Sequence, residues 1–217
     1  LWALWYLTLP VAPLPRDEEG EAGYGPLLRD PLVWVAALTL CAAVAGEAGF
    51  TLWLPYYLQK AKGLGEAASA GYMTAFFAGF TATRLAGSWV VERVGQVRSV
   101  VGLAGVGLVS LLALMLLPAA SLWMPVLAGA GIAVVFATCT ALLSMRYPER
   151  VNQVYTVTYS AGGLAGIFTG PLMGWLTDRV GAAVSMAVPL TAYVLVILLM
   201  TWYGLAGGAR RAVPEKA

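Results

Sequence analysis

Long stretches without charge alternate with short polar segments along this chain. A helix needs about 20 mostly apolar residues to cross a membrane. Six stretches approach or exceed that length, and none contains more than one charged residue. They cover residues 31–58, 67–91, 99–117, 122–145, 151–177 and 181–205. The pattern predicts an all-α fold, a polytopic membrane bundle of six transmembrane helices.

The remaining segments differ from these stretches in composition. Residues 1–15 are apolar but short, and we expect them to be the end of a preceding transmembrane helix. Residues 16–30 (RDEEGEAGYGPLLRD) are polar and acidic, as expected for a cytoplasmic linker. Residues 206–217 form a basic cytoplasmic tail. The predicted six-helix bundle therefore occupies residues 31–205.

The positions of Lys and Arg indicate how the bundle is oriented. Cytoplasmic loops of membrane proteins carry an excess of these residues. If the six helices alternate in direction, nine Lys and Arg fall on the side of the linker and the tail, and three fall on the opposite side. We therefore expect the linker and the C-terminus to be cytoplasmic.

Composition supports a membrane protein and excludes other classes. The chain is 60% hydrophobic and 11% charged, whereas soluble domains carry about 25% charged residues. Its net charge of +2 is too small for a nucleic-acid-binding surface. The chain has no His, and its two Cys lack the spacing of metal ligands. We therefore expect no enzyme activity, no cofactor and no metal site.

One short sequence occurs twice. WVVERVG at residues 89–95 recurs as WLTDRVG at residues 175–181, 86 positions later. The two copies would mark the same place in two units of three helices. An odd number of helices makes successive units point in opposite directions, so we predict two inverted three-helix repeats, as in many secondary transporters. Chance similarity between two charged turns is the alternative.

The first copy resembles a motif of the Major Facilitator Superfamily, G-x-L-x-[DE]-R-x-G-[RK]-[RK]. Residues 88–98 read SWVVERVGQVR, with Ser88 in place of the first Gly and with Gln96 and Val97 in place of the basic pair. The second copy, GWLTDRVG, keeps the Gly and the Leu. The chain is thus similar to the C-terminal six-helix half of such a transporter.

Two other stretches resemble the fucose-permease-like sugar symporters of this superfamily. Gly46-Glu47 followed by WLPYYL at residues 53–58 is similar to their seventh helix, and RLAG at residues 84–87 is similar to their eighth. The resemblance implies alternating-access transport of a small polar solute such as a sugar, coupled to protons, in a prokaryotic inner (plasma) membrane. It also implies that residues 16–30 are the central loop and that an N-terminal half completes the transporter.

Two other functions remain open at this point. One is an efflux transporter of the same superfamily for drugs or metabolites, which would have more aromatic than polar residues in its cavity. The other is a self-contained six-helix channel or scaffold that homodimerises.

Glu47 is the first candidate for a solute site, because a carboxylate inside a membrane costs about 2.5–3.5 kcal/mol. It shares a helical face with Phe50, Thr51 and Tyr57. An aromatic face with a polar group suits a sugar ring, so we predict that these four residues bind the solute. A structural hydrogen bond to a neighbouring helix is the alternative role for Glu47.

Arg84 is the second charge inside a predicted span. It shares a face with Phe77 and Thr81, and Phe80, one turn earlier, is expected to lie under its guanidinium as a cation–π partner. Its predicted depth differs from that of Glu47 by roughly 12 Å, so no direct contact is expected between them. We predict that Arg84, Phe77 and Thr81 line the cavity, with structural pairing of Arg84 as the alternative.

The fifth predicted helix carries two patterns. Asn152, Thr156 and Tyr159 share one face, which predicts either a water-lined solute pathway or interhelical hydrogen bonds. Glycines recur every four residues from Gly162 to Gly174 and predict close packing against another helix.

Two charged loops on the predicted cytoplasmic side are candidates for a gate. Ion pairs between them would hold the outward-facing state, and breaking such pairs would shift the equilibrium by about 1–3 kcal/mol. Positive charges that only anchor the protein in the membrane are the alternative. The predicted gate residues are Glu92, Arg93, Gly95, Arg98, Arg146, Glu149 and Arg150.

Overall fold

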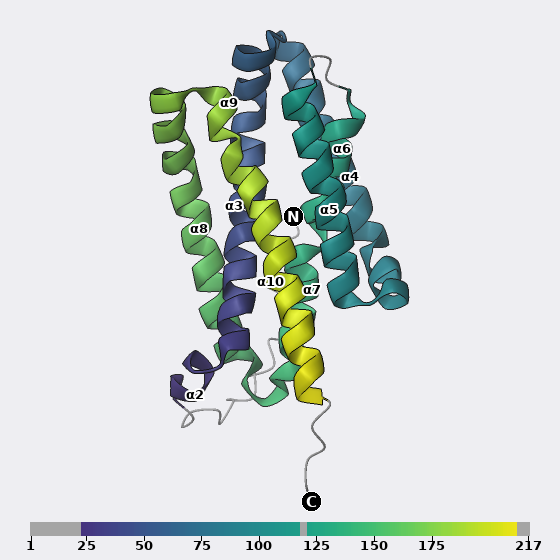
Figure 1. Ribbon diagram of the computed structural model, residues 1–217, viewed down its shortest axis with the longest axis vertical. Helices are drawn as coiled ribbons and strands as arrows, with labels where there is room; N and C mark the ends of the chain where they lie inside the picture. Colours follow the sequence, from purple (N-terminus) through teal and green to yellow (C-terminus); the bar gives the residue numbers. More distant parts are fainter. Residues whose placement is uncertain (1–22, 118–120, 212–217) are drawn as a thin grey trace, which may run out of the picture.

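Nearly all of the described chain is helical. The computed structural model describes residues 23–117 and 121–211, with side chains up to residue 206. Long helices lie side by side, and their ends gather at two opposite sides of the molecule (Figure 1). The predicted all-α bundle is confirmed.

The described helices follow one another without strands between them. They are α2 (Gly25–Leu28), α3 (Pro31–Lys62), α4 (Glu66–Val94), α5 (Gln96–Leu116), α6 (Trp123–Ala133), α7 (Val135–Arg146), the 3-10 helix η2 (Pro148–Arg150), α8 (Val151–Val180), α9 (Ala182–Ser185) and α10 (Ala187–Arg211). If α6–α7 and α9–α10 are each taken as one interrupted rod, each predicted span corresponds to one rod.

Four rods are long and apolar enough to cross a membrane, namely α3, α5, α6–α7 and α9–α10. The helices α4 and α8 have the length, with 29 and 30 residues, but they do not reach the same hydropathy. Both carry the polar residues that the sequence singles out as solute-site candidates, which explains their lower hydropathy. The apolar rods make this chain an integral membrane protein.

Local sequence signals define the ends of α3, which is longer than predicted. Asp30 accepts a hydrogen bond from the backbone N–H of Leu32 at 2.9 Å and so caps the N-terminus. Gly63 ends the helix with a φ of 69°, a left-handed conformation that costs glycine little. The helix therefore continues to Lys62, and the loop predicted at residues 59–66 is reduced to residues 63–65.

The two copies of the repeated turn adopt the same backbone geometry. Gly95 ends α4 with a φ of 93°, and Gly181 ends α8 with a φ of 91°, in a region that favours glycine. In each copy an arginine lies over a tryptophan, with Cζ 4.1 Å from the ring centre of Trp89 and 5.8 Å from that of Trp175. The two turns lie at opposite ends of the bundle (Figure 1). Two inverted repeats are therefore confirmed, although the charged turn predicted at 92–98 shrinks to Gly95.

Two rods that were predicted as continuous helices are interrupted. The break between α9 and α10 at Met186 has a proline as its cause. Pro189 has no N–H to donate to the carbonyl of Ser185, and its ring would collide with that carbonyl in a regular helix. The break between α6 and α7 at Val134 has no proline beside it, and it lies at the candidate site described below.

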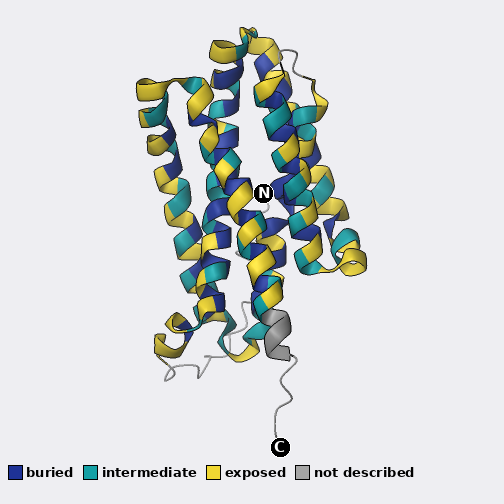
Figure 2. Ribbon diagram, viewed as in Figure 1, coloured by how far each residue is buried: buried dark blue, intermediate teal, exposed yellow. Residues whose placement is uncertain are grey.

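Buried side chains line the faces along which the helices meet (Figure 2). The helix α3 packs against both α8 and α10, and α4 packs against α6. Backbone approaches are closest between α4 and α6, where a Cβ on Gly79 would collide with the carbonyl of Val126 and one on Gly129 with the carbonyl of Phe76. On α8 the predicted close packing is confirmed at Gly166, where a Cβ would lie 3.2 Å from Val44 of α3, whereas the nearest atoms to a Cβ on Gly162, Gly170 or Gly174 would be at 3.5–3.9 Å.

The ends of the described chain differ from the predicted boundaries. The predicted linker contains the short helix α2, whose Leu27 is buried, and α10 continues to Arg211 into the predicted tail. The predicted end of a preceding helix at residues 1–15 and most of the linker lie outside the described residues. The roles assigned to these end segments therefore remain predictions.

Candidate functional site

One side of α4 carries exposed residues along the whole helix. They recur at intervals of three or four positions and therefore share a face. They are Glu66, Ala70, Thr74, Phe77, Thr81, Arg84, Ser88 and Glu92. We call this row the α4 strip. At 1.5 Å per residue it extends roughly 39 Å, more than the hydrocarbon thickness of a bilayer.

Two hollows lie along the α4 strip. A groove of about 800 Å³ runs between α3 and α4 and is lined by Gln59, Glu66 and Thr74, with Phe77 and Thr81 further along. A second hollow of about 330 Å³ lies beside α6 and α7. It is lined by Arg84, Gly87, Ser88, Val91, Glu92, Ala133, Val134, Ala137, Thr138 and Ala141. The strip thus borders open space on both sides of Arg84.

Arg84 is held in place by two contacts. Its Nε–H donates a hydrogen bond to the backbone carbonyl of Ala133 at 3.3 Å. Its Cζ lies 4.2 Å from the ring centre of Phe80, so the predicted cation–π contact is confirmed. Ala133 is the last residue of α6, directly before the break at Val134. The guanidinium therefore binds the helix where its backbone hydrogen-bond ladder is interrupted.

Glu47 lies half-buried in the middle of α3. The charge of Arg84 acts on its carboxyl group, but within the described residues no ion pair shorter than 4.0 Å joins the two. The two charges therefore make no ion pair in this conformation. The two charges are nevertheless close enough to influence each other, which the sequence-based difference in depth did not suggest.

A cluster of aromatic and hydroxyl side chains joins α7 to α8. The ring of Tyr159 lies 5.1 Å from that of Tyr155 and 5.0 Å from that of Phe136, measured between centroids. The hydroxyls of Tyr159 and Thr140 are 3.0 Å apart and share a hydrogen bond. Tyr155 donates to the backbone carbonyl of Thr140 at 3.1 Å. Tyr159 keeps 36% of its surface exposed, so the residue remains accessible to a ligand.

The structure brings the two groups of candidates together on α6–α7. Arg84 of α4 contacts Ala133, and Tyr159 of α8 contacts Phe136 and Thr140. These contacts lie within two turns of one rod, about 10 Å along its axis. Asn152 and Thr156, which precede Tyr159 on α8, are exposed like Tyr159. Polar and aromatic side chains of α4, α7 and α8 thus lie near one another along the α6–α7 rod. We call this set, together with the α4 strip, the polar wall.

Not every predicted solute residue is on this wall. Phe50 is fully buried and stacks on Phe76 with 4.7 Å between ring centroids. Tyr57 is also buried, and its hydroxyl donates to the carbonyl of Met115 at 3.5 Å. Thr51 is partly buried and donates to the carbonyl of Glu47 in its own helix at 2.8 Å. In this conformation Phe50 and Tyr57 pack in the core because their helical face meets the neighbouring helices.

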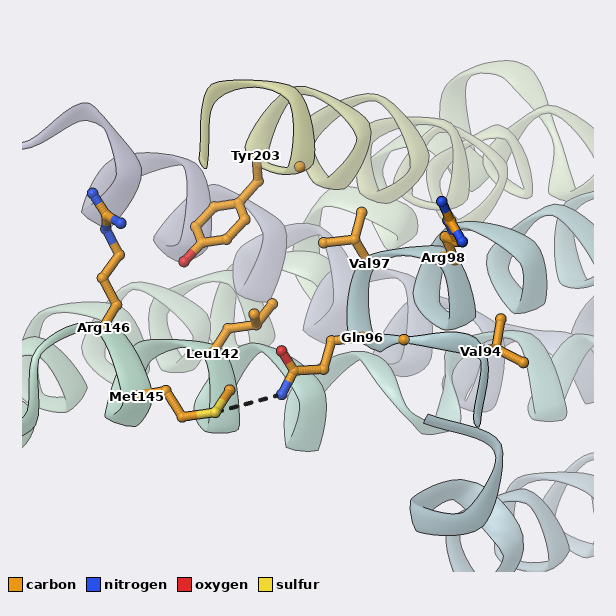
Figure 3. Close-up of a pocket in the computed structure, with 10 residues that line it drawn as sticks. Val94, Gln96, Val97, Arg98, Leu142, Met145, Arg146 and Tyr203 are labelled. Carbon is orange, nitrogen blue, oxygen red and sulfur yellow. Dashed lines mark hydrogen bonds between the residues drawn. The ribbon is translucent and has the colours of Figure 1, made fainter. Parts of the chain in front are cut away.

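The predicted gate segments meet at one end of the bundle. A cavity of about 580 Å³ lies where the α4–α5 turn approaches the ends of α7 and α10, and it is lined by Gly95, Arg98 and Arg146 (Figure 3). Gln96 donates to the sulfur of Met145 at 3.9 Å across it. Arg98 and Arg146 lie toward opposite ends of the cavity in Figure 3. The proximity of the two segments is compatible with a gate.

The gate charges do not pair in this conformation. Glu92, Arg93 and Glu149 are exposed, and Arg150 is partly buried in η2. In the part of the chain that the structure describes, no ion pair joins Glu92 to Arg146 or Arg150. The predicted latch therefore remains a prediction for another conformation.

Tyr147 connects the same end of α7 to the start of α3. Its hydroxyl donates a hydrogen bond of 2.7 Å to Asp30, the residue that caps α3. Burial, followed by this hydrogen bond, raises the pKa of Tyr147 to about 12. The hydroxyl therefore stays protonated at neutral pH and keeps donating to Asp30. Asp30 and Tyr147 are 117 residues apart in the sequence, so no local pattern indicates this contact.

Sequence reasoning missed several residues of the wall. On α4 it missed Glu66 and Thr74, and on α7 it missed Phe136 and Thr140, whereas Ser88 was expected on the face of Arg84. The spacing of the polar residues along α4 could have identified the first two. No comparable signal exists on α7, because its side chains are mostly apolar and the contact with Tyr159 depends on how α7 packs against α8.

Comparisons with known proteins agree with this architecture. The family model described as Major Facilitator Superfamily matches residues 1–169. A solved structure described as a Major Facilitator Superfamily (MFS) transporter, FucP, in the outward conformation, is similar with a TM-score of 0.74 and 17% identity over 93% of this chain. The alignment covers 51% of that protein, so the chain spans about half its length. No curated protein matches the chain.

Proposed function

Because the chain belongs to the Major Facilitator Superfamily, we propose that it is the C-terminal half of a secondary transporter and not an enzyme. Residues 16–30 would be the central cytoplasmic linker, 31–205 the six-helix transporter bundle and 206–217 a cytoplasmic tail. The N-terminal half would complete the solute cavity, in a prokaryotic inner membrane with the C-terminus in the cytoplasm. Transport would proceed by alternating access between the two halves.

The α4 strip is the observation that carries this proposal. A row of exposed side chains, most of them polar, extends along a helix of a membrane protein, and the same helix buries Tyr72, Phe76 and Phe80 on another face. Exposure of polar groups to lipid is costly, so this row is better accounted for by a water-filled pathway. Two hollows border it, and Arg84 lines the second of them. A pathway with these properties favours a polar solute over a hydrophobic drug.

A sugar is the solute class that the wall supports best. Sugar rings offer apolar C–H faces and hydroxyl groups. The exposed rings of Phe77 and Tyr159 suit the first, and the hydroxyls of Thr81 and Thr156 suit the second. We therefore propose a sugar or a related polyol as the transported solute.

Glu47 is the proposed proton-coupling residue of this half. It is the carboxylate placed within a predicted span, and Arg84 acts on its charge. A carboxylate can bind a proton on one side of the membrane and release it on the other when its surroundings change. Protonation of Glu47 would also alter the charge balance around Arg84 and so link the proton to the solute site.

Uptake by the intact protein in proteoliposomes tests this proposal. With an inward proton gradient, we expect saturable accumulation of a labelled sugar, and we expect Glu47→Gln to abolish accumulation driven by the gradient. Asp178→Asn is the control, because Asp178 is exposed at the far end of α8. Accumulation by Glu47→Gln at the wild-type rate would remove Glu47 from the coupling mechanism. Absence of saturable uptake for any sugar would contradict the assigned solute class.

A further inference from the structure

Arg84 has hydrogen-bonding capacity that the structure leaves unused. A guanidinium has five N–H donors. The Nε–H of Arg84 is bound to the carbonyl of Ala133, and the four donors on its two terminal nitrogens have no hydrogen-bond partner among the described residues. The side chain is exposed on the α4 strip. Arg84 therefore presents a free pair of parallel donors to the pathway.

The guanidinium is also held in a defined orientation. Phe80 lies below its plane at 4.2 Å, and the bond to Ala133 fixes its Nε edge. A donor group fixed before binding loses little entropy when a ligand arrives. The free edge has the fork geometry that matches the two oxygens of a carboxylate.

The positive charge of Arg84 is not paired with a carboxylate of the described residues, so an anion could bind to it. Within the described residues no carboxylate lies in ion-pair contact with Arg84, although Glu47 acts on it at longer range. A cation at this depth is costly without a counter-charge. A negatively charged solute would supply this charge, and a vicinal diol or a neutral ring would not.

We propose that the transported solute carries a carboxylate group, that Arg84 binds it through two parallel hydrogen bonds, and that the solute class is a sugar acid. This inference rests on the proposed function. Thr81 and Ser88 lie within about one helical turn of Arg84 on the same strip and are placed to bind hydroxyls of the ring. The solute carboxylate would compete with Glu47 for the charge of Arg84, so solute binding would favour protonated Glu47.

Two sugars with nearly the same ring allow the contribution of the carboxylate to binding to be measured by itself. D-glucuronate carries a carboxylate where D-glucose carries a hydroxymethyl group. We expect the purified intact protein to bind glucuronate at least about tenfold more tightly than glucose, measured by titration calorimetry, because a hydrogen bond to a charged group is worth about 1.5–3 kcal/mol. This comparison uses the wild-type protein and does not depend on the folding of a variant.

Variants of Arg84 then assign the effect to this side chain. Arg84→Gln should lose about tenfold or more of the glucuronate affinity and most of the preference for glucuronate over glucose, and Arg84→Lys should fall between the two proteins. Arg179→Gln is the matched control, because Arg179 also lies over an aromatic ring, that of Trp175, but at the far end of α8. Its affinities should equal those of the wild type.

Three results would overturn the inference. Glucose binding as tight as glucuronate binding would show that the site does not recognise a carboxylate, and the proposed transport of a sugar would stand. A preference for glucuronate that survives in Arg84→Gln would place the carboxylate at another residue. Binding of neither probe would contradict both this inference and the assigned sugar class.

Discussion

Arg84 and Tyr159 combine two properties that the other candidate residues do not combine. Each is anchored to the α6–α7 rod by a hydrogen bond, and each is exposed as a residue. Phe50 and Tyr57 are anchored but buried, so in this conformation they can support the wall but not contact a solute. We therefore expect a residue to contact the solute when a neighbouring helix holds it in place and it still remains exposed. A residue that is held in place but buried contributes only to packing.

Tyr159→Phe tests this distinction. The substitution removes the hydroxyl shared with Thr140 and leaves the aromatic stack intact. Interhelical hydrogen bonds in membranes contribute only about 0.6 kcal/mol on average, so we expect a small loss of stability but a several-fold increase in the KM for solute uptake. Tyr155→Phe is the control, because the hydroxyl of Tyr155 is bound to a backbone carbonyl. Equal KM values for both variants would remove Tyr159 from the pathway.

The helix α4 packs closely against a neighbouring helix on one face and carries exposed polar residues on another. Towards α6 it carries Gly79, which allows the two backbones to meet, and towards the pathway it carries the α4 strip. This division explains how a helix with several polar residues can be held firmly in a membrane bundle. Close backbone contact favours packing through dispersion where no hydrophobic effect operates between helices.

Gly79→Ala should therefore destabilise the protein. A methyl group at this position would collide with the carbonyl of Val126, and a backbone cannot move aside at low cost. We expect a loss of about 1–3 kcal/mol, measured as a lower Tm of the purified protein. Gly71→Ala, in the same helix, has no neighbour within 4 Å and should be neutral or slightly stabilising. A Tm for Gly79→Ala equal to that of Gly71→Ala would contradict the close packing of α4 on α6.

In the molecule as a whole, two regions have different expected roles in alternating access. The polar wall is formed by residues of α4, α7 and α8, and the cavity in Figure 3 lies where the α4–α5 turn approaches the ends of α7 and α10. Tyr147 and Asp30 tie α7 to α3 at that end. We therefore expect movements that open or close this end to act on both α3 and α7.

Glu92→Ala tests whether this end contains a gate. If Glu92 pairs with Arg146 or Arg150 in the outward-facing state, the substitution should favour the inward-facing state by about 1–3 kcal/mol. The measurement is the labelling rate of a cysteine placed at Ser88, in the intact protein without Cys41 and Cys139, from the cytoplasmic side. We expect faster labelling. Asp178→Ala, in the second copy of the turn, should leave the rate unchanged, and the same unchanged rate in Glu92→Ala would leave the latch without support.

The sequence determined the fold class and the positions of the long helices, because both depend on local apolar length. It also indicated the inverted repeat, since the same turn needs the same glycine at Gly95 and Gly181. The cation–π contact of Arg84 with Phe80 was predictable for the same reason, because residues one turn apart on a helix are neighbours.

Tertiary structure decided which of the candidate residues face open space. Phe50 and Thr51 are adjacent in the sequence, yet Phe50 is fully buried and Thr51 only partly, because burial depends on which helix lies against each face. The break at Val134 and the contact between Tyr159 and Thr140 likewise have no local signal. Helical periodicity places side chains on a face, but only the packing of neighbouring helices determines whether that face becomes core or pathway.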